Sequence, residues 1–223
     1  MGGQPIPDEL WIDWLGLERA KAFKKVSTNA LMQDLVLANQ KISAAIFEDC
    51  SYVEVALRNR LSAGMQRRLE RISSSASWLE DPTGELQTID GGRFFKQIQD
   101  ARRRAMGAKS CADESDIVAE LSLGFWIGLL SKKSQKLRID LIGNLPGYQS
   151  RSMNQLMNGL NEFRNLRNRV AHHHGVLHRD IQRDAQSVLL IASWIDPVLR
   201  DFVAANSRIE ALRGESGFLT RLG

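Results

Sequence analysis

The residues of this chain best suited to acid–base chemistry are its four histidines, which all lie within the seven positions from His172 to His178. Imidazole is the side chain that gains and loses a proton near neutral pH, so proton transfer at that pH has to use this stretch. A run of cations and amides precedes it, FRNLRNRVA over residues 163–171. A fixed cation beside an imidazole suits cleavage of a phosphodiester without a metal, because the imidazole moves protons while the cation stabilises the developing negative charge.

Arg167 is the cation whose position is unusual. If the stretch is a helix, Arg167 falls on the same stripe as a set of apolar residues with helical spacing. That stripe consists of Leu156, Leu160, Phe163 and Val170. Arg164, Asn168 and His172 follow one another along the neighbouring flank at steps of four residues. A buried guanidinium is costly unless it is paired, so Arg167 needs a partner or a task.

Two other chemistries have weaker support in the same residues. His174 and His178 have the i, i+4 spacing that places two metal ligands on one helical face, but Gly175 is expected to end the helix between them. The chain has no HExxH motif, and neither Cys50 nor Cys111 is near the histidines in sequence. Nucleophilic catalysis would need a serine or cysteine in a recognisable motif, and the sequence contains none. We therefore expect no metal site and no cofactor.

Cleavage of RNA by Arg167 and His172 sets a geometric condition. Five residues along a helix separate two side chains by about 7.5 Å along the axis and about 140° around it, so one pair converges only if the helix ends or bends. Two copies across a two-fold axis could share one cleft, which predicts a homodimer with the apolar stripe at the subunit interface. The alternative is structural: Arg167 forms an ion pair with Asp49 or Glu54, and the three consecutive histidines are a polar helix end favoured by the helix dipole.

The elements that must position these residues all have helical periodicity. The long segment that starts at Ser27 or Thr28 has no glycine or proline before Gly64, and its length favours a bend or break near residues 49–51. Pro197 is expected to kink the last helix. No alternating run of β-branched residues is present, so the sequence predicts an all-α helical bundle. Helices are expected at about 10–17, where two tryptophans dock, and at 27–64, 94–106, 117–130, 137–145, 152–175 and 180–206.

Length and composition fit one globular domain over residues 1–223, with a loose N-terminal arm at 1–8 and a loose C-terminal tail at 207–223. Residues 71–85 are rich in serine and predict a surface connection. A formal net charge of +4 permits contact with phosphate groups without demanding it. The two cysteines form no framework, which favours a reducing compartment, and no leader or membrane-spanning run is evident. We therefore expect a cytoplasmic protein without a membrane partner.

Three blocks of the sequence resemble a known family. The string FRNLRNRVAHHHG, residues 163–175, contains R-N-x-x-x-H at Arg167, Asn168 and His172, which resembles the RX4-6H signature of HEPN domains. YVEVALRNRL (52–61) and LSLGFWIGLLSK (121–132) are similar to segments of the Abi-like (AbiD/AbiF-type) proteins of bacterial phage defence. The blocks occur in the family's order, and the resemblance covers about Trp11 to Pro197.

The resemblance implies an all-α, HEPN-like helical bundle that acts as a homodimer. It also implies a metal-independent endoribonuclease of abortive infection, or a toxin, whose paired motifs cut RNA to leave a 2′,3′-cyclic phosphate and a 5′-hydroxyl. An antitoxin or a regulatory partner would then control it. The alternative within the same family is a non-catalytic HEPN module that binds RNA or a protein.

Roles for individual residues follow from the same resemblance. Arg167 would position and stabilise the phosphate, Asn168 would orient groups at the site, and His172 would be the acid or base. Glu54 would orient Arg167 from the long N-terminal helix, and His173 would support His172, although the motif does not decide among His172, His173 and His174. The expected RNA contacts are Arg164, Arg169, Arg102 and Arg103. A run such as Arg102–Arg104 is more often a solvated helix face than a binding patch.

Overall fold

The prediction of an all-helical protein is confirmed. The structure, a computed structural model, describes residues 6–72, 75–108, 112–150 and 152–215, and no strand occurs in these ranges. Three short 3-10 turns, η1 (Trp78–Glu80), η2 (Ile89–Gly92) and η3 (Lys132–Ser134), lie between the α-helices. The α-helices are α1 (Asp8–Leu15), α2 (Leu17–Lys24), α3 (Met32–Ile72), α4 (Glu85–Thr88), α5 (Arg93–Ala108), α6 (Glu114–Glu120), α7 (Leu123–Leu129), α8 (Gln135–Ile142), α9 (Met153–Ala171), α10 (Ile181–Ile195), α11 (Pro197–Asn206) and α12 (Ile209–Glu215).

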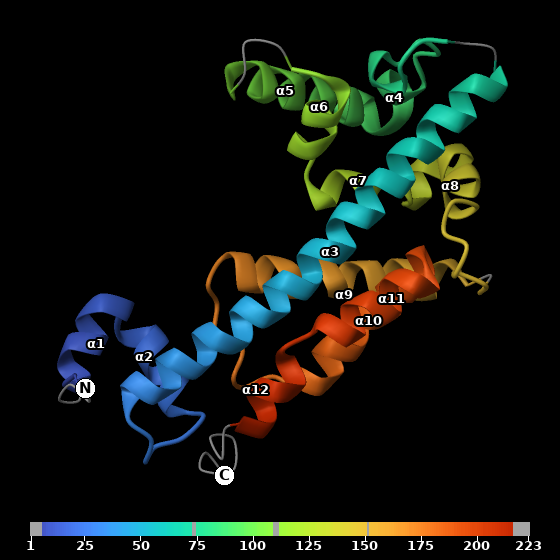
Figure 1. Cartoon of the computed structure of the whole chain (residues 1–223). Helices are drawn as coiled ribbons and strands as arrows, with labels where there is room; N and C mark the ends of the chain where they lie inside the picture. The colour runs from blue at the N-terminus through green and yellow to red at the C-terminus, as the bar shows by residue number, and fades with distance from the viewer. Residues whose placement is uncertain (1–5, 73–74, 109–111, 151, 216–223) are drawn as a thin grey trace.

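Helix α3 is the axis around which the other helices are arranged (Figure 1). It has 41 residues and is therefore about 60 Å long. Helices α4 to α8 gather on its C-terminal half, while α9 to α12 run along its N-terminal half and α1 and α2 lie at its start (Figure 1). The site residues on α9 and the arginine run on α5 therefore belong to different halves of the molecule.

The prediction of a break in this helix near residues 49–51 is wrong, and so is its end at Gly64. Cys50 is fully buried, and Asp49 accepts a hydrogen bond of 2.6 Å from the Ser207 hydroxyl, so tertiary contacts hold the middle of α3. Gly64 is buried, and a Cβ there would lie 2.6 Å from Asn144 Nδ2. This glycine lets the chain after α8 approach α3 closely, and the helix continues through it.

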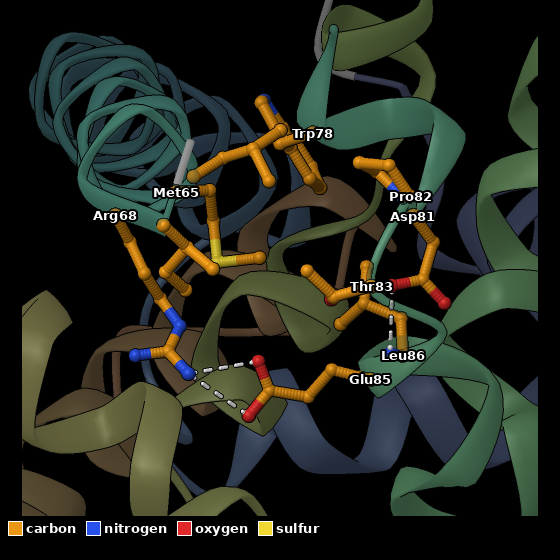
Figure 2. A pocket seen from close by; sticks show the side chains of 10 residues that line it. Met65, Arg68, Trp78, Asp81, Pro82, Thr83, Glu85 and Leu86 are labelled. Carbon is orange, nitrogen blue, oxygen red and sulfur yellow. Dashed lines mark hydrogen bonds and ion pairs between the residues drawn. The ribbon is translucent and has the colours of Figure 1, made fainter. Parts of the chain in front are cut away.

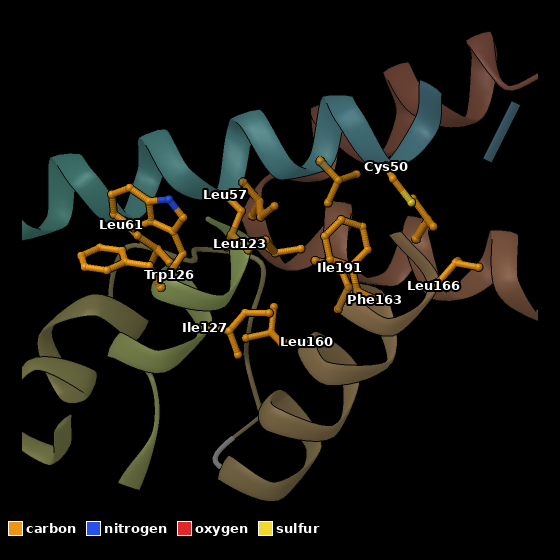
Figure 3. Packing of buried hydrophobic residues seen from close by; sticks show 14 of the residues in the cluster. Cys50, Leu57, Leu61, Leu123, Trp126, Ile127, Leu160, Phe163, Leu166 and Ile191 are labelled. Carbon is orange, nitrogen blue, oxygen red and sulfur yellow. The ribbon is translucent and has the colours of Figure 1, made fainter. Parts of the chain in front are cut away.

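The core is formed where α3 meets α7, α9 and α10. Figure 3 shows Leu57 and Leu61 of α3 facing Leu123 and Trp126 of α7, with Phe163 of α9 beside them. Each of these side chains is 4 % exposed or less. Burial of an aliphatic or aromatic side chain of this size contributes roughly 1.5–3 kcal/mol, so this contact fixes α9 firmly against α3.

Two helices predicted as continuous are each divided in two. Ser122 separates α6 from α7, and its hydroxyl accepts a hydrogen bond from the Phe125 amide. Asp196 separates α10 from α11 with extended backbone angles, because proline disfavours the helical conformation in the residue before it. Pro197 is the first residue of α11, where a missing amide proton costs nothing. It therefore begins a helix and does not kink one.

The predicted tail and connection also differ from the structure. Within the predicted tail 207–223, residues 209–215 form α12 and Ile209 is 2 % exposed; residues 216–223, like 1–5 of the arm, lie outside the described ranges. Of the two N-terminal tryptophans, Trp14 is 59 % exposed, so it does not dock. In the connection 71–85 Trp78 is buried, and Figure 2 shows Glu85 paired with Arg68 of α3. That segment is packed against α3.

Candidate functional site

Helix α9 carries the motif, and its two ends are fixed by different interactions. Ser152 caps its start by accepting a hydrogen bond of 3.3 Å from the Gln155 amide. The helix ends at Ala171, and His173 has a left-handed backbone with φ 57°. The prediction that Gly175 ends the helix is therefore wrong by four residues. The chain leaves the helix before Gly175 because Val176 is held against α3. The Val176 amide donates a 2.7 Å hydrogen bond to Asn39 Oδ1 of that helix.

The apolar stripe of α9 is buried inside the subunit. Its four residues are 4 % exposed or less, and α9 packs with this stripe against α3, α7 and α10. The hypothesis that the stripe is the subunit interface is therefore wrong. Arg167 lies at the edge of an intramolecular core, and its position on the stripe is explained by a partner on α3.

That partner is Glu54. Arg167 Nε donates a 2.7 Å hydrogen bond to Glu54 Oε2, and Arg167 Nη1 lies 3.4 Å from Asn168 Oδ1. The Arg167 side chain is 30 % exposed and the Glu54 side chain 18 %. Asp49, the other carboxylate considered from the sequence, instead accepts from Ser207. The Glu54 carboxylate fixes one edge of the guanidinium, and Nη2 has no hydrogen-bond partner within the described residues.

Phe47 is a further contact of Arg167 that the motif did not indicate. The Arg167 guanidinium carbon lies 6.0 Å from the centroid of the Phe47 ring, at the outer limit of a cation–π contact. Phe47 precedes Glu54 by seven residues, two turns of α3, and so lies on the same helix face. That spacing was the sequence signal for it. Its ring is 42 % exposed and covers one side of the guanidinium.

The three consecutive histidines are all exposed at the end of α9. The His172 amide donates a 2.9 Å hydrogen bond to the Asn168 carbonyl, so its backbone closes the last turn of the helix. The rings of His172 and His174 have centroids 6.4 Å apart. Within the described residues no imidazole nitrogen of this group has a hydrogen-bond partner. Arg167 contacts Glu54, Asn168 and Phe47, and among the described residues no contact joins it to the His172 ring.

The alternatives to phosphodiester chemistry lose their geometric basis. His174 and His178 lie beyond the end of α9, so they do not share a helical face. In the described part of the chain no group of three or more His, Cys, Asp or Glu side chains is placed to hold a metal ion. Cys50 is buried, which raises the pKa of its thiol far above the usual value, and Cys111 lies outside the described residues. Cys50 therefore supplies no activated nucleophile.

His178 borders a groove between α9 and α10. The groove has a volume of about 440 Å³ and is lined from α9 by Asn165 and from the other side by His178 and Arg183. Arg179 is held at its wall by two hydrogen bonds of 2.6 Å to Asp184. Burial, followed by the charges of Arg169 and Arg179, lowers the pKa of His178. His178 is therefore neutral at pH 7.

The four predicted RNA-binding arginines are not brought together. Arg164 has no carboxylate partner in the described residues, while Arg169 donates a 3.1 Å hydrogen bond to the Gly175 carbonyl and supports the histidine turn. Arg102 is paired with Glu80, and Arg103 with Asp100. Helix α5, which carries this second pair, lies in the other half of the molecule (Figure 1). Only the arginines of α9 adjoin Arg167.

Fold and site together define an all-helical protein in which a carboxylate-held arginine lies just before an exposed histidine at a helix end. Comparisons of the chain with models of protein families, with curated proteins and with solved structures return no match. None of the helices in the described ranges combines the length and apolar character that a membrane crossing needs.

Proposed function

We propose that the chain is a metal-independent endoribonuclease of the HEPN type, similar to the Abi-like proteins of phage defence. The observation that carries the proposal is the contact series Glu54–Arg167–Asn168 on two packed helices, with His172 at the end of the same helix. Glu54 holds the guanidinium, whose exposed edge would contact a phosphate. The imidazole nitrogens of His172 have no hydrogen-bond partner in the described residues, and this imidazole would move the proton.

The proposed reaction uses no ion bound by the protein. The imidazole of His172 would take the proton of the 2′-hydroxyl or give one to the leaving 5′-oxygen, which yields a 2′,3′-cyclic phosphate and a 5′-hydroxyl. Arg167 would stabilise the negative charge that develops on the phosphate oxygens. One imidazole serves one proton transfer at a time, so a second copy of the chain would supply the other group.

Homodimerisation therefore belongs to the proposal. Because the apolar stripe of α9 is internal, the two-fold contact would use surface residues near the end of α9. A cytoplasmic location and control by an antitoxin or a regulatory partner are the setting in which such an activity would operate. Light scattering of the purified protein would measure the mass of the assembly.

Cleavage of single-stranded RNA in the presence of EDTA tests the function. We expect the wild-type protein to cut, and His172→Ala to cut at least roughly a hundredfold more slowly, because a general acid or base contributes about 10² to 10⁴. His174→Ala is the matched control, since His174 is also exposed in the same turn, and His173→Ala tests the supporting role expected of His173. Equal cleavage by His172→Ala and wild type, or cleavage only with a divalent ion, would overturn the proposal.

One observation favours the alternative, a module that binds RNA without cutting it. The imidazole of His172 is not oriented by any hydrogen bond within the described residues, whereas catalytic histidines are usually oriented by a second group. This alternative predicts that wild type and His172→Ala bind RNA equally and that neither forms a cyclic phosphate. Analysis of product ends separates the two functions.

A further inference from the structure

Helix α9 carries a row of asparagines that has no role in the fold. They recur at steps of four, three, four and three residues and occupy the flank of the helix that ends at His172. Three of them are exposed and two are half-buried, and only Asn168 has a side-chain contact within the described residues. The row, called the amide row below, consists of Asn154, Asn158, Asn161, Asn165 and Asn168.

A solvated helix face does not explain this row. Asparagine has a lower helix propensity than alanine, glutamate, lysine or glutamine, which are the common residues at exposed helix positions. Five asparagines in one 19-residue helix therefore oppose the conformation that the helix adopts. The row also contains no apolar residue, whereas the core of a protein–protein interface is apolar and rich in aromatic side chains. A ligand rich in hydrogen-bonding groups suits it better.

The surroundings of the row contain arginines as well as carboxylates. Arg164 lies beside it on α9 and has no carboxylate partner in the described residues. On α3, Arg58 is one turn after Glu54, and its Nε is buried without a hydrogen-bond partner. At its centre the row adjoins the groove between α9 and α10, because Asn165 lines that groove together with His178 and Arg183. Glu162, Asp180 and Asp184 line the same groove, and Arg183 lies 3.9 Å from Glu162. Guanidinium groups beside amide groups match the phosphates and the base edges of a nucleic acid.

We propose that the amide row is the surface on which single-stranded RNA is held and its bases are read, so that one phosphate reaches Arg167 and His172. The inference deepens the proposed function and rests on it for the choice of RNA as ligand. An amide both donates and accepts hydrogen bonds, so each asparagine can pair with a base edge, while the arginines hold the backbone. From Asn154 to Asn168 the row is about 21 Å long, so it contacts more than one nucleotide.

The test measures RNA binding separately from cleavage. All variants are made in the His172→Ala background, and fluorescence anisotropy gives the affinity for a labelled single-stranded RNA of mixed sequence and for four homopolymers. The variant Asn158→Ala/Asn165→Ala removes two exposed amides of the row. Gln87→Ala/Gln135→Ala is the matched control, because it removes two exposed amides from α4 and α8 in the other half of the molecule.

We expect the Asn158/Asn165 variant to bind mixed RNA at least roughly tenfold more weakly and to lose preference among the homopolymers, since a base-edge contact discriminates by about that factor or more. Its salt dependence should not change, because amides carry no charge. Arg164→Ala should instead reduce the slope of log affinity against log salt by roughly one. The melting temperature of the asparagine variant should be unchanged or higher, as alanine favours the helix.

Several results would overturn the inference. These are unchanged affinity in the Asn158/Asn165 variant, an equal loss in the Gln87/Gln135 control, or loss of a dimer in place of loss of RNA binding, which would make the row a protein interface. Failure of the proposed function has a different signature. If the wild-type protein binds RNA through the amide row and does not cut it, the inference about the row is supported and the proposed nuclease function is refuted. If the protein cuts RNA and the Asn158/Asn165 variant binds it as well as wild type, the function is supported and the inference is refuted. Absence of any RNA binding at low salt overturns both.

Discussion

Replacement of Glu54 by glutamine is the most informative perturbation of the site. In the wild-type protein Arg167 Nε donates a 2.7 Å hydrogen bond to Glu54. Glutamine keeps an oxygen that can accept this hydrogen bond, but it removes the negative charge. The guanidinium then lies at the edge of the core beside Phe47 with a neutral partner. Its position is no longer fixed by an ion pair, and it is free to sample other rotamers.

The expected loss of stability is moderate. An exposed ion pair contributes about 0–1 kcal/mol, and breaking a fully buried one costs about 3–5 kcal/mol. With side chains 30 % and 18 % exposed, the Arg167–Glu54 pair lies between these limits. We expect Glu54→Gln to lower the free energy of unfolding by about 1–2 kcal/mol. The effect on RNA cleavage should be larger, roughly a hundredfold in kcat/KM, because displacement of a catalytic group by about 1 Å can cost that much.

Urea denaturation and a cleavage assay on the same preparations measure both effects. The matched control is Glu85→Gln, because Glu85 pairs with Arg68 on α3 at 2.9 Å and the two side chains are 21 % and 18 % exposed. That pair, which Figure 2 shows from close by, joins α4 to the C-terminal end of α3, in the other half of the molecule (Figure 1). We expect the control to lose at most about 1–2 kcal/mol of stability. Its loss should be smaller than that of Glu54→Gln, because Asp140 also contacts Arg68. The control should keep the wild-type cleavage rate.

Two outcomes would refute this reasoning. If Glu54→Gln is destabilised but cuts RNA at the wild-type rate, then Glu54 holds the fold and does not position Arg167 for the reaction. If Glu54→Gln and Glu85→Gln lose activity equally, the loss reflects general stability. A rate that recovers in Glu54→Asp, which restores the charge, would strengthen the assignment.

Two further predictions concern the fold. Burial raises the pKa of the Asp49 carboxyl, so the folded state holds its proton more tightly than the unfolded state. The stability from this group is present at low pH and is lost as pH rises from about 4 through the folded pKa. Urea unfolding between pH 3.5 and 7 should show Asp49→Asn gaining stability relative to the wild type as pH rises, and a constant difference would contradict this. A Cβ at Gly147 would overlap the Ser193 carbonyl oxygen, so Gly147→Ala should lose about 3 kcal/mol or more. Gly107→Ala, which meets nothing within 4 Å on α5, should gain about 0.5–1 kcal/mol, and thermal unfolding that ranks the two alike would refute the steric account.

The corrections to α3 and to the end of α9 share one physical cause. Periodicity identified the helical segments, but it could not decide where contacts between distant residues override a local signal. Gly64 and residues 49–51 were expected to interrupt α3, yet packing against α8 and the hydrogen bond from Ser207 carry the helix through both. Conversely, α9 ends before the glycine that was expected to stop it, because Asn39 holds the chain at Val176, 137 positions away.

The sequence by itself determined that three of the four histidines are consecutive. The 3.6-residue helical repeat also determined that the protein is all-helical and that Arg167 falls on an apolar stripe. Only the tertiary structure decided which carboxylate meets Arg167 and which surface the stripe covers. Glu54 and Asp49 are both on α3 but point to different sides of that helix. The packing of α3 against α9 and α12 places Glu54 beside Arg167 and Asp49 beside Ser207. The same packing buries the apolar stripe within one subunit, because burying this apolar area against α3, α7 and α10 stabilises the fold.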